Sequence, residues 1–114
     1  MNRRAGLALG WAWVVAIIYL SVTPSPPQIP VESGDKVGHF LAYGVAAFWF
    51  SLFYKRKGAF LHGLGLIALG IALEFVQRRL GYRSFEVADM AADAIGVAAG
   101  CGLTLWFLAH RRWH

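Results

Sequence analysis

Charged residues are scarce in this chain of 114 residues. Lys, Arg, Asp and Glu together make up 15% of the sequence, whereas apolar residues make up 58%. An average soluble domain carries about 25% charged residues. The composition therefore argues against an ordinary soluble domain, and the length predicts a single domain covering residues 1–114.

Cysteine and proline are also rare. Cys101, which lies in an apolar run, is the sole cysteine, so a disulfide framework or a cysteine metal motif cannot form within one chain. We expect Cys101 to be a small core or lipid-facing residue. All four prolines lie between positions 24 and 30, where they end the first apolar run.

Long apolar runs dominate the remaining sequence. Each approaches the roughly 20 residues that cross the hydrocarbon core of a bilayer. Strands are excluded because the runs are too long and do not alternate between apolar and polar residues. The first run resembles a signal peptide, but Ser21-Val22-Thr23 before Pro24 is a poor cleavage site, so we expect it to be retained. The sequence predicts an all-α, integral membrane four-helix bundle with up-down topology and transmembrane helices at about 5–22, 35–54, 59–78 and 85–109.

Basic residues predict the orientation of the bundle. Seven of them lie at the N-terminus, between the second and third runs, and at the C-terminus: Arg3, Arg4, Lys55, Arg56, Lys57, Arg111 and Arg112. With four crossings these three places share one side, which the positive-inside rule makes cytoplasmic. Because the basic residues form short flanks around apolar runs, we interpret the net charge of +5 as a topology signal that also contacts anionic lipid, and not as a nucleic-acid surface.

Polar residues gather at the opposite ends of the runs. His39 and Tyr43 are four residues apart and share one helix face, as do Asp89 and Asp93. In an up-down bundle these ends meet on the outer side of the membrane, and ionisable groups there indicate a functional site. The predicted ligand-binding cluster comprises Asp35, Lys36, His39, Tyr43, Glu74, Gln77, Arg78, Arg83, Ser84, Asp89 and Asp93.

The carboxylates of this cluster need compensation. Basic neighbours such as Arg83 could supply it, or the deepest acid, Asp93 or Glu74, could carry a proton. A purely structural role is the alternative, since polar contacts between membrane helices contribute about 0.6–2 kcal/mol each. Ser84 could be only a helix N-cap.

The cluster could carry out one of three kinds of chemistry: metal binding, catalysis or ligand binding. Metal binding is disfavoured because no HExxH-like ligand pair is present, and neither a metal nor another cofactor is expected. Catalysis would use His39 with Glu74 or Asp89 as acid and base, which leaves open whether the protein is an enzyme.

Binding is the third chemistry. Lys36, Arg78 and Arg83 would form a cationic rim for a phosphate or carboxylate, while Tyr43 and Gln77 would supply hydrogen bonds. A lipid headgroup fits that arrangement best.

Small residues predict close helix contacts. Gly96 and Gly100 form a GxxxG pattern, and Gly6 and Gly10 form another. Such spacing lets helix backbones approach each other. The face carrying Gly96 and Gly100 could mediate a homo-oligomer.

Five segments resemble one family. They are Leu20–Pro24, Asp35–Tyr43, Glu74–Gln77, Arg83–Glu86 and Asp89–Gly96, and in this order they are similar to VanZ-like proteins. One departure is Asp93, where the pattern of the family has Asn. The namesake of the family is tied to resistance to the glycopeptide antibiotic teicoplanin, so the resemblance implies a role in the bacterial envelope.

The sequence thus predicts a multi-pass protein of a bacterial cytoplasmic membrane, with both termini cytoplasmic. Its outer polar pocket would bind an envelope component such as a lipid headgroup or a glycopeptide-like ligand. The alternatives are an intramembrane enzyme acting on a lipid-linked envelope precursor and a small membrane scaffold or assembly subunit.

Overall fold

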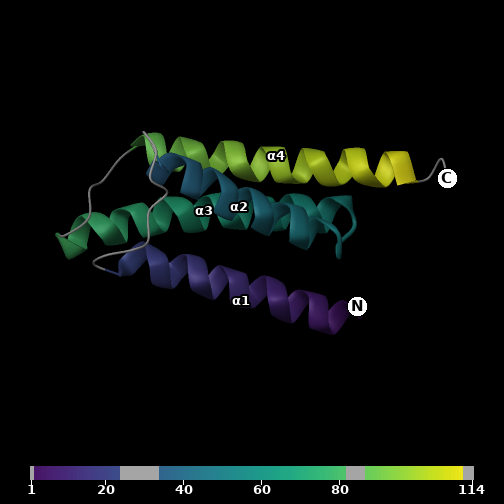
Figure 1. The fold of residues 1–114 in the computed structure, drawn as a ribbon, viewed down its shortest axis with the longest axis horizontal. Coiled ribbons are helices and arrows are strands. Elements are labelled where there is room, and N and C mark those ends of the chain that lie inside the picture. Colours follow the sequence, from purple (N-terminus) through teal and green to yellow (C-terminus); the bar gives the residue numbers. More distant parts are fainter. Residues whose placement is uncertain (1, 24–33, 82–86, 112–114) are drawn as a thin grey trace.

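Four α-helices make up the structure, a computed structural model that describes residues 2–23, 34–81 and 87–111. The helices are α1 (Arg3–Val22), α2 (Gly34–Ser51), α3 (Arg56–Leu80) and α4 (Val87–Arg111) (Figure 1). No strand occurs within the described ranges. The predicted all-α class is confirmed for this part of the chain, and each helix begins and ends within three residues of its predicted bounds.

Local chemistry explains several helix ends. Asn2 caps α1, because its side chain accepts a hydrogen bond of 2.8 Å from the backbone amide three residues later. The left-handed backbone of Gly81, with φ of 81°, ends α3. α2 ends at Ser51, three residues before the prediction. The amides of Leu52 and Phe53 bond instead to carbonyls three residues earlier, which tightens the chain into turns.

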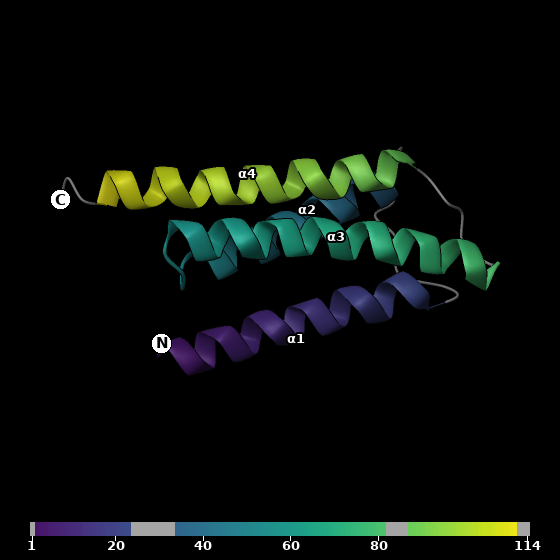
Figure 2. The ribbon, with the colours of Figure 1, turned by 180° about the vertical axis from the view of Figure 1, so that it is seen from behind.

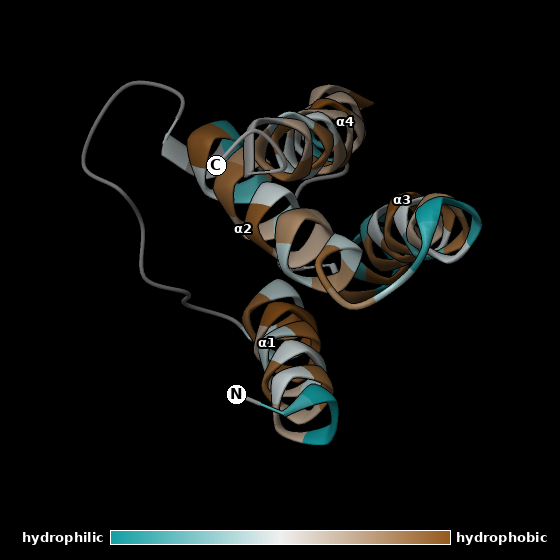
Figure 3. Cartoon of the chain, turned by 90° about the vertical axis from the view of Figure 1, so that its right-hand side faces the viewer, coloured by the Kyte–Doolittle hydropathy of each residue, from teal (hydrophilic) through white to brown (hydrophobic). Residues whose placement is uncertain are grey.

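The helix ends divide the molecule into two regions. The start of α1, the connection from α2 to α3 and the end of α4 lie together, and we call this region the basic end after Arg3, Lys55, Arg56 and Lys57 (Figures 1 and 2). The start of α2, the end of α3 and the start of α4 lie at the other end, which we call the polar end. α2 packs most extensively against α4, while α1 contacts α2 and α3 but, within the described residues, not α4 (Figure 3).

Glycines allow α2 and α4 to touch backbone to backbone. A Cβ atom on Gly96 would collide with the carbonyl oxygen of Phe40, and one on Gly100 with the carbonyl oxygen of Gly44. The predicted contact face of α4 is therefore confirmed, and its partner is α2 of the same chain. A homo-oligomer or scaffold contact through these two glycines stays a prediction, and it would require α2 to move away.

α1 is held against α2 by aromatic side chains. The ring of Phe53 occupies the space beside Gly6, where a Cβ atom would collide with it. The indole N–H of Trp49 donates to the carbonyl of Gly6 at 2.7 Å, and that of Trp13 donates to the carbonyl of Ala42 at 2.9 Å. These bonds satisfy the indoles between apolar helices.

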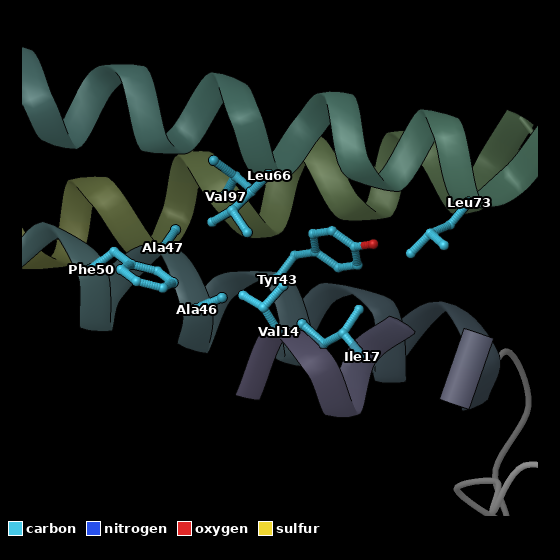
Figure 4. Packing of buried hydrophobic residues seen from close by; sticks show 9 residues of the cluster. All are labelled: Val14, Ile17, Tyr43, Ala46, Ala47, Phe50, Leu66, Leu73 and Val97. Atoms are coloured by element: carbon cyan, nitrogen blue, oxygen red, sulfur yellow. The ribbon is translucent and has the colours of Figure 1, made fainter. Parts of the chain in front are cut away.

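Buried apolar residues from all four helices form the core. They are Val14, Ile17, Tyr43, Ala46, Ala47, Phe50, Leu66, Leu73 and Val97 (Figure 4). Large apolar side chains also cover the outside, for example Tyr19, Phe60 and Val87, which are 65%, 63% and 67% exposed. Exposed apolar surface on this scale is unusual for a soluble monomer.

Three of the four helices have the length and apolarity to cross a membrane. They are α1, α3 and the stretch of α4 from Val87 to Ala109. Four such spans were predicted. α2 differs because its 18 residues include Asp35, Lys36 and His39 in the first two turns.

Candidate functional site

One face of α2 presents the first part of the polar cluster. Lys36 and His39 are partly exposed, with side chains 35% and 18% accessible. Tyr43 follows one turn later and is only 2% exposed. The rings of His39 and Tyr43 are parallel, with centroids 6.4 Å apart and planes 2° from each other. The face thus runs from a reachable lysine inward to a buried phenol, whose ring extends toward Leu73 in Figure 4.

Two aspartates of α4 hold His39 between them. Nδ1 of His39 lies 2.7 Å from Oδ1 of Asp93, and Nε2 lies 3.8 Å from Oδ2 of Asp89. The Nζ atom of Lys36 lies 3.7 Å from Oδ1 of Asp89. The four-residue spacing on each helix places these groups on facing sides, and the glycine contact brings the helices close enough for them to meet. His39 thus lies within side-chain reach of Asp89, while the expectation that Asp35 joins them falls outside the described side chains.

This geometry fixes the orientation of the imidazole ring of His39. The 2.7 Å contact is the length of a charge-assisted hydrogen bond, in which Nδ1–H of His39 donates to the carboxylate of Asp93. Nε2 is then the nitrogen on which a proton can be gained or lost, and it faces Asp89 at a longer distance. A histidine oriented by one carboxylate and facing a second group has the arrangement of an acid–base residue.

The second oxygen of Asp93 lies in a socket beside α3. Asp93 is 1% exposed, and its Oδ2 atom has no hydrogen-bond partner in the described part of the chain. A Cβ atom on Gly70 would collide with this oxygen, so the carboxyl fits because position 70 has no side chain. A buried polar atom left without a partner costs about 1–3 kcal/mol, so a carboxyl retained here calls for a functional explanation.

α3 contributes two further buried polar residues. Glu74 is 1% exposed and lies one turn after Gly70, on the side of α3 that packs against Asp93. Gln77 is 2% exposed, and its Nε2 donates to the carbonyl of Ser21 at 2.7 Å. We predicted Gln77 to bind a ligand, but this bond uses its amide to hold the last turn of α1, where backbone carbonyls lack helical partners.

The other predicted site residues lie at the edge of the described cluster or beyond it. Arg78 is exposed near the end of α3, one turn after Glu74. Arg83 and Ser84, with the side chain of Asp35, lie outside the described residues. The predicted pairing of Arg83 with Asp89 is therefore untested.

The described cluster is richer in acids than in bases. It holds the carboxyl groups of Glu74, Asp89 and Asp93, against Lys36 and His39. Sequence reasoning named all five but missed Gly70, which makes room for Asp93. In the sequence, this role of Gly70 was indicated only by its position as a small residue one turn before Glu74. That signal is weak, because glycines are frequent throughout this chain.

Comparison with known proteins finds one informative relative. The chain is 30% identical over 115 residues to the uncharacterized protein C11E3.10 of Schizosaccharomyces pombe, across 96% of this chain and 67% of that protein. The chain belongs to the family of this fission-yeast protein. No family model and no solved structure matches this chain. The name of the relative states no ligand or reaction, and its source is a fungus.

Proposed function

We propose that the protein is a VanZ-like integral membrane protein whose four helices cross the cytoplasmic membrane of a bacterium in up-down order. The three apolar helices and the exposed apolar surface support this placement. α2 would be the fourth span, because its polar first turns face the aspartates of α4 and not lipid. Both termini and the connection around Lys55 would be cytoplasmic, and the polar end would lie in the outer leaflet.

The polar cluster binds the headgroup of an envelope lipid or lipid-linked component. The observation that carries this proposal is His39 held between Asp93 and Asp89, with its side chain 18% accessible and that of the neighbouring Lys36 35% accessible. The two carboxyl groups beside His39, those of Asp89 and Asp93, favour a ligand that brings hydrogen-bond donors, such as the ammonium of an ethanolamine headgroup. Lys36 and Arg78 would bind the phosphate of the same lipid.

Lipid retention tests this proposal. The protein is placed in nanodiscs containing equal amounts of phosphatidylethanolamine and phosphatidylcholine, and the retained lipids are identified by native mass spectrometry. We expect the wild type to retain phosphatidylethanolamine selectively and His39→Gln to lose most of that selectivity. His62→Gln is the matched control, because His62 lies toward the basic end, stacked on Tyr54 with ring centroids 4.1 Å apart. Equal retention by all three proteins would contradict the proposal.

Catalysis is the second candidate, favoured by the 2.7 Å contact that orients His39 and leaves Nε2 for proton transfer. The substrate would be a lipid-linked envelope precursor. In this case the wild type converts a radiolabelled precursor added to proteoliposomes, and His39→Gln abolishes conversion while still binding the precursor. Loss of binding together with conversion would favour the pocket over the enzyme.

A further inference from the structure

A groove lies between α3 and α4 on the side of the basic end, away from the polar cluster. Its volume is about 660 Å³, within the range of about 300–1,000 Å³ found for small-molecule sites. Its walls are mostly apolar and include Phe60, Leu64, Ile67, Val97, Ala98 and Leu105. Because Phe60, Leu64 and Leu105 are 63%, 47% and 51% exposed, the groove opens sideways along the two helices.

Two hydroxyl groups in the walls of the groove are bonded within the protein. The hydroxyl of Thr104, which is 1% exposed, lies 3.1 Å from the carbonyls of both Phe48 and Gly100. The hydroxyl of Ser51 donates to the sulfur of Cys101 at 3.6 Å. The groove thus presents an apolar surface to an occupant and offers it few hydrogen bonds.

Charge is confined to one end of the groove. Lys55 and Arg56 line it there, and none of the described residues that line the groove is acidic. Both side chains are exposed at the start of α3. Two cations beside an apolar slot complement a molecule with an anionic head and an apolar tail.

The length of the groove matches one leaflet of a membrane. A helix rises about 1.5 Å per residue, so the step from Arg56 to Ile67 covers roughly 16 Å. Half of a hydrocarbon core of about 30 Å is about 15 Å. A lipid with its phosphate at Arg56 could therefore lay one acyl chain along the groove as far as Ile67 and Val97.

We propose that this groove is a binding site for an anionic phospholipid, with one acyl chain between α3 and α4 and the phosphate between Lys55 and Arg56. The lipid belongs to the leaflet opposite the polar cluster. The inference rests on the membrane location proposed above but not on the ligand of that cluster.

Phosphatidylglycerol is the probe, offered with equal phosphatidylcholine in nanodiscs and measured by native mass spectrometry. We expect the wild type to retain phosphatidylglycerol over phosphatidylcholine, and Lys55→Gln with Arg56→Gln to lower that preference roughly tenfold or more. Lys57→Gln removes a neighbouring exposed charge that does not line the groove, and it should change the preference less than about twofold. Equal losses in these variants would overturn the proposal, because they would indicate general attraction to the charged end.

A bulky side chain placed in the groove distinguishes an acyl chain from other occupants of the groove. Ala98 lines the groove and Ala99 does not, and both are exposed on α4. Ala98→Trp should abolish retention of phosphatidylglycerol, whereas Ala99→Trp should preserve it. A wild-type dimer that dissociates in Ala98→Trp would overturn the proposal in favour of a second copy of the chain. Retention of phosphatidylethanolamine in Ala98→Trp shows that the variant folds and that the polar cluster acts independently.

Cys101 gives a readout that needs no variant, because it lines the groove and is the sole cysteine. Alkylation of Cys101 by N-ethylmaleimide should be several-fold slower in nanodiscs containing phosphatidylglycerol than in nanodiscs of phosphatidylcholine alone. Equal rates would contradict an acyl chain in this place. The wild type could fail to select phosphatidylethanolamine while phosphatidylglycerol still slows the alkylation of Cys101. That result would overturn the polar-cluster proposal and leave this one standing.

Discussion

A single imidazole connects the polar groups of two helices. His39 contacts Asp93 at 2.7 Å and faces Asp89 at 3.8 Å. Removing one member of a buried ionic pair typically costs about 3–5 kcal/mol, because the other member is left without compensation. Because His39 is partly exposed, we expect the cost of removing one member of its pair with Asp93 to be smaller.

We expect His39 and Asp93 to be energetically coupled. In a double-mutant cycle, His39→Gln and Asp93→Asn should each destabilise the protein, and the double variant should recover about 1–3 kcal/mol relative to the sum. Thermal unfolding in detergent measures the coupling. The control cycle pairs Asp93→Asn with His62→Gln, which should be additive because His62 bonds to the carbonyl of Gly58 in its own helix. Additivity in both cycles would remove the His39–Asp93 pair from the model.

Gly70 and Gly65 give a matched test of the socket beside Asp93. Gly70→Ala should lower the free energy of unfolding by about 1–3 kcal/mol, because the new methyl group would collide with Oδ2 of Asp93. Gly65→Ala in the same helix meets no atom within 4 Å and should be neutral or stabilising by up to about 1 kcal/mol. Chemical denaturation of both variants checks this. A neutral Gly70→Ala would show that the carboxyl is not seated against α3.

Spacing along the sequence accounts for the part of the site that lies on two helix faces. Residues four apart share a face, so the alignment of His39 with Tyr43 and of Asp89 with Asp93 could be predicted without coordinates. The bond from Gln77 to Ser21 could not, because it depends on where the end of α1 docks. The role of Gly70 likewise depends on how α3 is rotated relative to α4, which periodicity leaves open.

At the level of elements, the contact between α2 and α4 is the most extensive one between the described helices. Gly96 and Gly100 place α4 directly on the carbonyls of α2, and this approach sets the distance at which His39 meets its aspartates. Helix bounds were predictable from apolar runs and capping residues. The early end of α2 at Ser51 was not, because Phe53 leaves the helix and packs its ring against Gly6 of α1.

Enlarging Gly100 should separate these two helices. Gly100→Leu would drive its side chain into the carbonyl of Gly44 and should destabilise the protein by about 3 kcal/mol or more, since the backbone of α2 cannot give way cheaply. At Gly102, two residues later on α4, a Cβ atom meets nothing within 4 Å, so Gly102→Leu should leave the melting temperature nearly unchanged. Thermal unfolding of both variants in the same detergent provides the comparison. Equal melting temperatures would contradict the close packing of α2 on α4.

On the scale of the whole molecule, charge is divided between the two ends. Arg3, Lys55, Arg56 and Lys57 belong to the basic end, and the buried carboxyl groups belong to the polar end. This division was predictable from the positions of charges relative to apolar runs. The groove between α3 and α4 was not, because its walls are mostly apolar, like the rest of both helices between their polar ends, and the space depends on how the two helices pack.

Chemical labelling of intact cells tests the proposed orientation. With Cys101→Ser as background, cysteines at Arg4 and Lys57 should resist an impermeant maleimide, while a cysteine at the exposed Arg79 near the end of α3 should react. Permeabilised cells provide the control, in which all three positions should react. Labelling at Lys57 in intact cells would reverse the orientation and move the polar cluster to the cytoplasmic leaflet.

The separation of His39 from its partner along the chain also has a consequence for biogenesis. Asp93 follows His39 by 54 residues, so at roughly 5–20 residues per second the ribosome delivers it about 3–11 s later. During that interval α2 carries Lys36 and His39 with no aspartate of α4 to face, and unpaired ionisable groups are costly in hydrocarbon. Under the proposed membrane placement, we therefore expect α2 to stay beside the insertion machinery until α4 emerges, so that the two helices enter the bilayer together as a preassembled pair.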